Sequence, residues 1–138
     1  MPTATTIQIM SAATLTASGR SGPYLSTNIS MAAVMAVAAT APTGTTPKLT
    51  MYLEFTLDSG TPTNFIQIPY DLKAITASAA TDQTATANKR NILDQITAVQ
   101  VACAIYKHFP FASFYLGYQI EGTASPTFTN VSVLFVGK

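Results

Sequence analysis

Strict alternation of apolar and polar residues is the dominant pattern of this chain. From Leu49 to Leu57 every odd position is apolar, whereas the even positions hold Thr, Tyr and Glu. A period of two places the odd side chains on one face of a strand and the even ones on the other. The run ends in the turn-rich segment 58–62, and a second β-rich run, 63–69, follows it. We therefore expect these two runs to form an antiparallel hairpin.

The same alternation recurs in the C-terminal part, over residues 112–121 and again over 127–136. Further strands are expected at 5–10, 14–17, 28–39 (with a break near Met31) and 98–106. Many short strands separated by turn residues are typical of an antiparallel two-sheet β-sandwich or jelly roll. The sequence therefore predicts an all-β fold of this type, as a single domain over residues 1–138.

Two segments depart from this pattern. Residues 71–91 are rich in Ala and Thr and show no period, and Ala favours a helix whereas the interleaved Thr does not. We expect a long loop there with at most one short helix, near either 71–79 or 89–96. Residues 1–10 have no evident partner strand, so they are a candidate for an arm that adds to the sheet edge of a neighbouring copy.

Two similar segments, 44–50 and 122–129, each combine Gly, Thr and Pro between two β-rich runs. We interpret each one as a hairpin loop, in which Gly accepts a positive φ and Pro ends the loop. The similarity reflects either two structurally equivalent hairpins or a shared bias in composition.

Charge is scarce in this chain. Charged residues make up 9% of the sequence, against about 25% in ordinary soluble domains. Thr, Ser and Ala take their place, and these residues cost little to desolvate. We interpret this composition as a surface that other subunits cover, and the alternative is a sparsely charged monomer.

The charge and hydropathy patterns also exclude some partners. A net charge of +1 with no clustered basic face argues against binding to nucleic acid. The apolar run at 30–41 is too short for the roughly 20 residues that span a bilayer, and the N-terminus lacks the features of a signal peptide. We expect a product of the cytoplasm that does not associate with membranes.

The residues needed for catalysis do not gather into a motif. The six acidic residues are scattered, mostly at turn or outward strand positions where a carboxylate is solvated, and there is one His and one Cys. These numbers do not suffice for a structural zinc site, and no nucleophile–base or phosphate-binding motif is present. We therefore predict no enzyme activity, no catalytic residue, no cofactor and no metal. Cys103 lies in the apolar run 99–105 and is expected to be a small buried thiol.

The candidate functional residues are instead those of an interface. Tyr52 and Tyr115 stand at outward strand positions, with Phe111 in register with Tyr115, and His108 lies in the loop before Phe111. Aromatic residues are enriched at the centres of protein interfaces. We predict Tyr52, Phe111, Tyr115 and His108 as contact residues, with burial inside the monomer as the alternative for Tyr52.

Two stretches of the chain resemble small tailed-bacteriophage virion proteins. The first is AATAPTGTTPKLTMYLE at 38–54 with the turn LDSG at 57–60, and the second is IEGTASPTF at 120–128. The similarity covers about residues 30–70 and 112–136. It departs in 71–91, and Phe65 stands where those proteins often have a Trp after the Asp-Gly turn.

This resemblance implies a β-sandwich protein of the capsid surface, either a decoration (cement) protein or an auxiliary head protein. Its expected partners are the major capsid protein and copies of itself, and it adds no catalytic residues. The alternatives are a neck, tail or baseplate component of the virion, or a carbohydrate-binding β-sandwich adhesin module.

Overall fold

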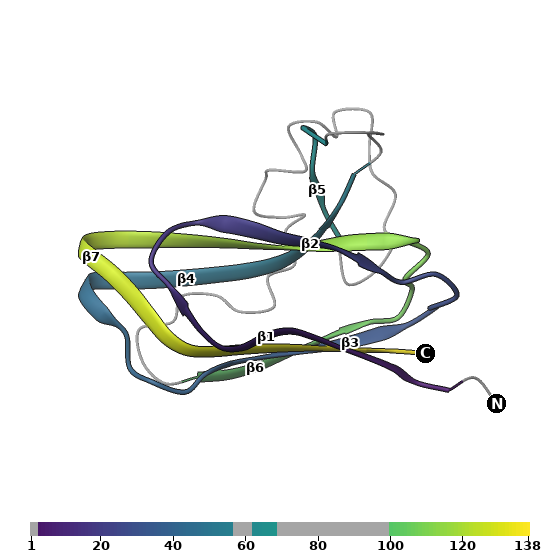
Figure 1. Cartoon of the computed structure of the whole chain (residues 1–138), viewed down its shortest axis with the longest axis horizontal. Coiled ribbons are helices and arrows are strands. Elements are labelled where there is room, and N and C mark those ends of the chain that lie inside the picture. The colour runs from purple at the N-terminus through teal and green to yellow at the C-terminus, as the bar shows by residue number, and fades with distance from the viewer. Residues whose placement is uncertain (1–2, 57–61, 69–99) are drawn as a thin grey trace.

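The computed structural model describes residues 3–56, 62–68 and 100–138, which form an all-β fold (Figure 1). Every strand pair is antiparallel, and no helix occurs within these residues. The predicted all-β class is therefore confirmed, whereas the predicted loop or short helix at 71–91 lies outside the described residues. The strands are β1 (Thr5–Leu15), β2 (Gly19–Leu25), β3 (Ala32–Ala38), β4 (Thr43–Phe55), β5 (Ile66–Gln67), β6 (Gln100–Tyr106) and β7 (Ser113–Gly137).

The long strand β7 is the axis of the fold. Its first half lies between β2 and β4, and its second half lies between β1 and β3. β5 extends the sheet beyond β4, and β6 extends it beyond β3, which gives the order β5-β4-β7-β3-β6 with β1 and β2 attached to β7. One continuous hydrogen-bonded sheet thus contains all the described strands.

This sheet curls, because β7 turns back on itself at the left end of Figure 1. The inward faces of its two halves meet: the ring of Phe114 in the first half stacks on that of Phe135 in the second, with centroids 4.5 Å apart. Phe109, which precedes β7, packs edge-on against Phe114 and is tilted against Phe135. An aromatic cluster therefore joins the two halves.

The positions that the alternation predicts to face inward are the ones buried in the core. Leu49, Met51 and Leu53 are fully buried on β4, as the odd positions of that run should be. In β7 the same holds for the second half, whose inward residues are Val131, Val133 and Phe135. Burial of side chains of this size stabilises the fold by about 1.5–3 kcal/mol each. The other buried apolar side chains of the described residues are Leu15, Ile29, Ala32, Val34, Ala36, Ala38, Ile68, Ala104, Tyr106, Phe109, Phe114, Leu116 and Phe128.

The two Gly-Thr-Pro segments are not separate hairpin loops, and that prediction is wrong. Both lie inside long strands and pair with each other, with Thr45 opposite Thr123 and Lys48 opposite Glu121. The ladder contains register shifts here, and Gly44 and Gly122 have φ of 106° and 126°. These bulges bend β4 and β7 together, because extra residues with positive φ turn a strand without ending it. Gly and Pro therefore mark the bend of the sheet.

The N-terminal segment is also placed differently from the prediction. Residues from Thr5 onward pair with β7 of their own chain, starting with Thr5 opposite Gly137, so from this point they are not a free arm. The partner strand lies more than a hundred residues away in sequence, where a local pattern gives no signal.

The expected antiparallel pairing of the runs 49–57 and 63–69 is confirmed, although the paired region is short. β5 pairs with the end of β4 through Glu54 opposite Gln67 and Phe55 opposite Ile66. β2 was not among the predicted strands. Its sequence, GRSGPYL, contains two Gly and one Pro, which normally indicate a turn.

Candidate assembly surface

The outward face of the first half of the sheet is organised around an ion pair. The Arg20 side chain on β2 donates two hydrogen bonds to the Glu54 carboxylate on β4, Nε to Oε1 at 2.9 Å and Nη2 to Oε2 at 3.0 Å. The Arg20 guanidinium also lies 3.5 Å from the centre of the Phe65 ring. Glu54 is only 5% exposed, so it is not the solvated carboxylate that its outward position suggested. A bidentate partner offsets the cost of burying its charge.

Gly117 makes room for this ion pair. It lies on β7 opposite both Arg20 and Tyr52, and a Cβ at this position would overlap the Tyr52 ring and the Glu54 carboxylate. The Tyr52 ring thus lies close against the backbone of the sheet. Burial raises the pKa of the Tyr52 phenol, the nearby Glu54 carboxylate raises it further, and Arg20 opposes both. This predicted contact residue is half-buried within its own chain, as the alternative prediction had it.

Tyr115 lies on the same face as Tyr52. Its pairing partner on β4 is Glu54, and its ring meets that of Phe65 edge-on, with centroids 5.0 Å apart. Phe111, in contrast, does not continue this outward row. It precedes β7, packs against the core, and lies 4.5 Å from the Phe55 ring. The structure therefore brings Tyr52 and Tyr115 together and separates Phe111 from them.

His108 is exposed, in the segment that joins β6 to β7. It lines a shallow groove together with Ile29, Ser30, Phe109 and Pro110. This groove is distinct in its residues from the Tyr52 and Tyr115 face. The four predicted contact residues thus do not form one patch.

The outward face of the second half has a different character. Its side chains come from β3, β6 and β7 and are apolar apart from Ser132, which lies opposite Val37. We call the apolar ones the apolar face: Ala33, Met35, Val37, Cys103, Ile105, Leu134 and Val136. Register places Ile105, Ala33 and Val136 in one row, and Cys103, Met35 and Leu134 in the next. Met35 is 44% exposed and Ile105 is 65% exposed. The sequences of β3, β6 and the second half of β7 contain no charged residue.

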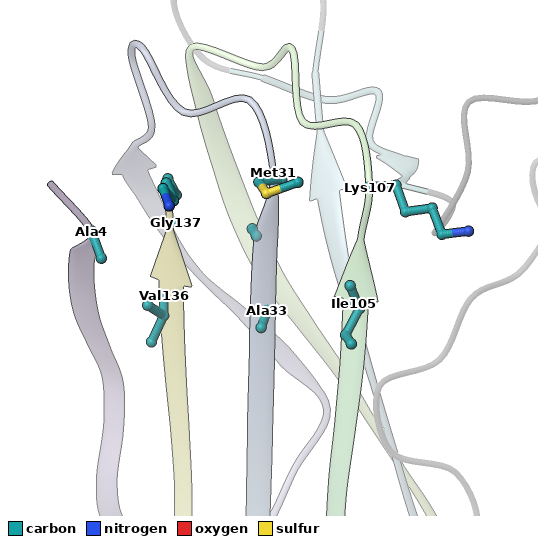
Figure 2. A pocket seen from close by; sticks show the side chains of 9 residues that line it. Ala4, Met31, Ala33, Ile105, Lys107, Val136 and Gly137 are labelled. Atoms are coloured by element: carbon teal, nitrogen blue, oxygen red, sulfur yellow. The ribbon is translucent and has the colours of Figure 1, made fainter. Parts of the chain in front are cut away.

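One end of the apolar face is hollowed into a groove of about 280 Å³. Figure 2 shows the side chains of Val136, Ala33 and Ile105 lying side by side on neighbouring strands of this groove. Met31 and Lys107 stand at its rim, and Met31 is 48% exposed. Lys138 is the second charged residue of the described lining. Exposed apolar side chains gathered over several strands, with few charges among them, are typical of a surface that binds another protein.

Cys103 is exposed on this face, so the prediction of a buried thiol is wrong. The inward residues of β6 are Ala104 and Tyr106, and Cys103 has the opposite parity. Apart from Gln100, the run 99–105 is apolar at odd and even positions alike, and its sequence therefore does not show which side faces the core.

Among the residues that the structure describes, no three His, Cys, Asp or Glu side chains gather as a metal site would require. No helix in the described ranges is long and apolar enough to cross a membrane. Comparison with known proteins found no matching family model, no matching curated protein and no matching solved structure. The apolar face is the feature of this chain that sequence reasoning missed. The sequence indicated it only through the scarcity of polar residues at both the odd and the even positions of β3 and β6.

Proposed function

We propose that this chain is a non-enzymatic structural protein of a virion, which decorates the capsid surface and stabilises contacts between major capsid subunits. The observation that carries the proposal is the apolar face, an uncharged surface over three strands on which Met35 and Ile105 are exposed. Such side chains gain free energy when another protein removes them from water. The resemblance of 38–60 and 120–128 to phage virion proteins is the reason for proposing that this other protein belongs to a capsid.

The proposal includes the finer architecture. The stacked contact between Phe114 and Phe135, which face each other from the two halves of β7, supports a two-layer β-sandwich of jelly-roll type. In such a sandwich each layer has one inward and one outward face. The apolar face is then the outward face of the layer that contains β3 and β6, and it is free to dock on a capsid.

In this function the partners are the major capsid protein and further copies of the chain, and the site of action is the capsid surface. Each subunit needs only a modest contact, because repeated contacts on a lattice act together. The same apolar face would serve a neck, tail or baseplate component. The two locations differ in the number of copies per particle.

The first experiment counts the chain in purified virions that encode it, by quantitative mass spectrometry against the major capsid protein. A decoration protein should be present at a fixed ratio of the order set by capsid symmetry. A few copies per particle would move the role to the neck or tail, and absence from the particle would overturn the proposal.

The second experiment tests the surface. Particles stripped of the chain should regain heat resistance when the purified chain is added back. Met35→Lys should weaken this binding about tenfold or more, because it places a charge at the centre of an uncharged interface. Leu25→Lys is the matched control: Leu25 is 76% exposed on β2, away from the apolar face. Equal loss of binding in both variants would exclude the apolar face as the docking site.

A further inference from the structure

The outer edge of β6 differs from every other strand edge that the structure describes. β6 pairs with β3 through seven consecutive residues, from Gln100 opposite Ala38 to Tyr106 opposite Ala32, without a register shift. Among the described strands it has no second partner. Its sequence, QVACAIY, contains no charge, no Gly and no Pro. A regular edge of this kind presents a row of backbone N–H and C=O groups that another strand can bind.

The other edge strands carry protection that β6 lacks. β1 has register shifts at three places, and its longest regular run is only Thr5–Gln8. β2 contains Arg20, Pro23 and one register shift. β5 has only two residues. Bulges, charges, prolines and short length are the devices by which proteins prevent strand addition at an edge. Such devices occur on β1, β2 and β5 but not on β6. Among the described edges, β6 is therefore the one most open to pairing with another strand.

We propose that β6 pairs with β6 of a second copy of this chain, antiparallel and about a two-fold axis at Cys103. β6 can pair with its own copy, because a strand of seven uncharged residues with Cys103 at its centre sets no like charges opposite each other in this register. Position 101 then lies opposite Ile105 of the partner, and Cys103 lies opposite Cys103. A two-fold contact also closes after two copies, so the edge does not template open-ended aggregation.

This pairing extends the docking surface. The outward side chains of β6, Cys103 and Ile105, belong to the apolar face, so joining two β6 edges makes two apolar faces continuous. The inference builds on the assembly function proposed above, but the pairing needs no capsid. A dimer would present to the lattice an uncharged surface twice as wide as that of one chain.

The first test is the mass of the reduced full-length chain in solution, by sedimentation equilibrium over a range of concentrations. The expected result is a reversible dimer of twice the 14.5 kDa of one chain. Cys103→Lys should raise the dimer dissociation constant about tenfold or more, because it sets two like charges directly opposite each other. Leu25→Lys, a matched change on the exposed part of β2, should leave dimerisation unchanged. If Cys103→Lys does not fold, Ile105→Lys tests the same edge.

The second test determines the register. Directly opposed residues of antiparallel strands have Cα atoms about 4.5–5.5 Å apart, within the range of about 4.4–6.8 Å that a disulfide bridges. Mild oxidation of the native chain should therefore link Cys103 to Cys103 rapidly. In a Cys103→Ser background, Ile105→Cys places the two thiols about 14 Å apart along the strands, given a rise of about 3.4 Å per residue. This variant should not be cross-linked.

Two results would overturn the proposal: a monomer at every concentration, or equally fast cross-linking of Cys103 and of the cysteine at position 105. Neither outcome depends on binding to particles. If the chain dimerises but does not bind capsids, the pairing stands and the proposed virion function fails. If Met35→Lys abolishes capsid binding while the chain is monomeric, the function stands and the pairing fails.

Discussion

On the outward face of the first half of β7, Arg20 binds Glu54 and lies on Phe65, whereas on that of the second half Met35 and Ile105 lie in solvent. Both faces belong to one curled sheet and share one core. The first face buries its charge and its aromatic rings in contacts within the chain. The second face exposes apolar groups, and among the described residues its charges, Lys107 and Lys138, line only the groove at one end.

This difference shows that the aromatic residues at outward strand positions are less exposed than Met35 and Ile105. Tyr52 and Tyr115 attract attention in the sequence, but both are half-buried beside the ion pair. On the second face the exposed large side chains are aliphatic, namely Met35 and Ile105. In the sequence, the scarcity of charge along β3 and β6 is the signal that marks this exposed face.

The largest expected loss of stability comes from a substitution in the shared core, and a substitution on the exposed face should cost far less. Phe135→Ala should lower the free energy of unfolding by about 3–5 kcal/mol, because it removes the ring that stacks on Phe114 between the two halves. Met35→Ala, a truncation of a 44% exposed side chain, should cost only about 0.5 kcal/mol. Urea denaturation followed by circular dichroism measures both, since the chain contains no Trp. Similar losses for the two variants would mean that Met35 is part of the core.

The sequence allowed the inward residues to be predicted wherever the two parities differ in polarity. Leu49, Met51 and Leu53 are the clearest case, because polar residues separate them and only one register buries all three. Cys103 could not be placed in this way, because its run, apart from Gln100, is apolar at odd and even positions alike. Its exposure depends on which side of β6 meets the core, and long-range pairing decides that.

Neither the bend nor the ion pair could be predicted, because both depend on long-range pairing. Gly44 and Gly122 have the local conformation of a turn, and only the pairing of the strands around them, with Thr45 opposite Thr123, shows that both strands continue through the bend. Arg20 and Glu54 are 34 residues apart, and β7 brings them together by lying between their strands. Local patterns contain no information on such contacts across a third strand.

The second prediction tests whether the ion pair stabilises the first face. Arg20→Met keeps most of the side-chain volume but leaves the Glu54 carboxylate buried without its partner. We expect a loss of about 2 kcal/mol, below the value for a fully buried pair because the Arg20 side chain is 39% exposed. Lys48→Met is the matched control, since its ion pair with Glu121 is longer, at 3.9 Å, and exposed. It should cost no more than about 0.5 kcal/mol.

A double-mutant cycle makes this prediction sharper. In a Glu54→Gln background Arg20→Met leaves no buried carboxylate without a partner, so it should cost clearly less than in the native chain. Equal costs in both backgrounds would assign the effect of Arg20 to its packing on Phe65 instead of its charge.

The smallest expected effect is a change in stability at alkaline pH. The pKa of Tyr52 lies above its ordinary value of about 10 in the folded chain, because burial and the Glu54 carboxylate disfavour the phenolate. Above pH 10 the unfolded chain therefore binds fewer protons than the folded chain, and the stability that Tyr52 contributes is lost as pH rises through its folded pKa. Tyr52→Phe cannot ionise and should show a shallower decline in unfolding free energy over the same range.

Arg20→Met should move the Tyr52 titration, followed by phenolate absorbance, to still higher pH, because Arg20 is the group that lowers this pKa. No such change is expected from Met35→Lys on the apolar face, so a shift of the Tyr52 titration in that variant would show that the two faces are coupled through the sheet.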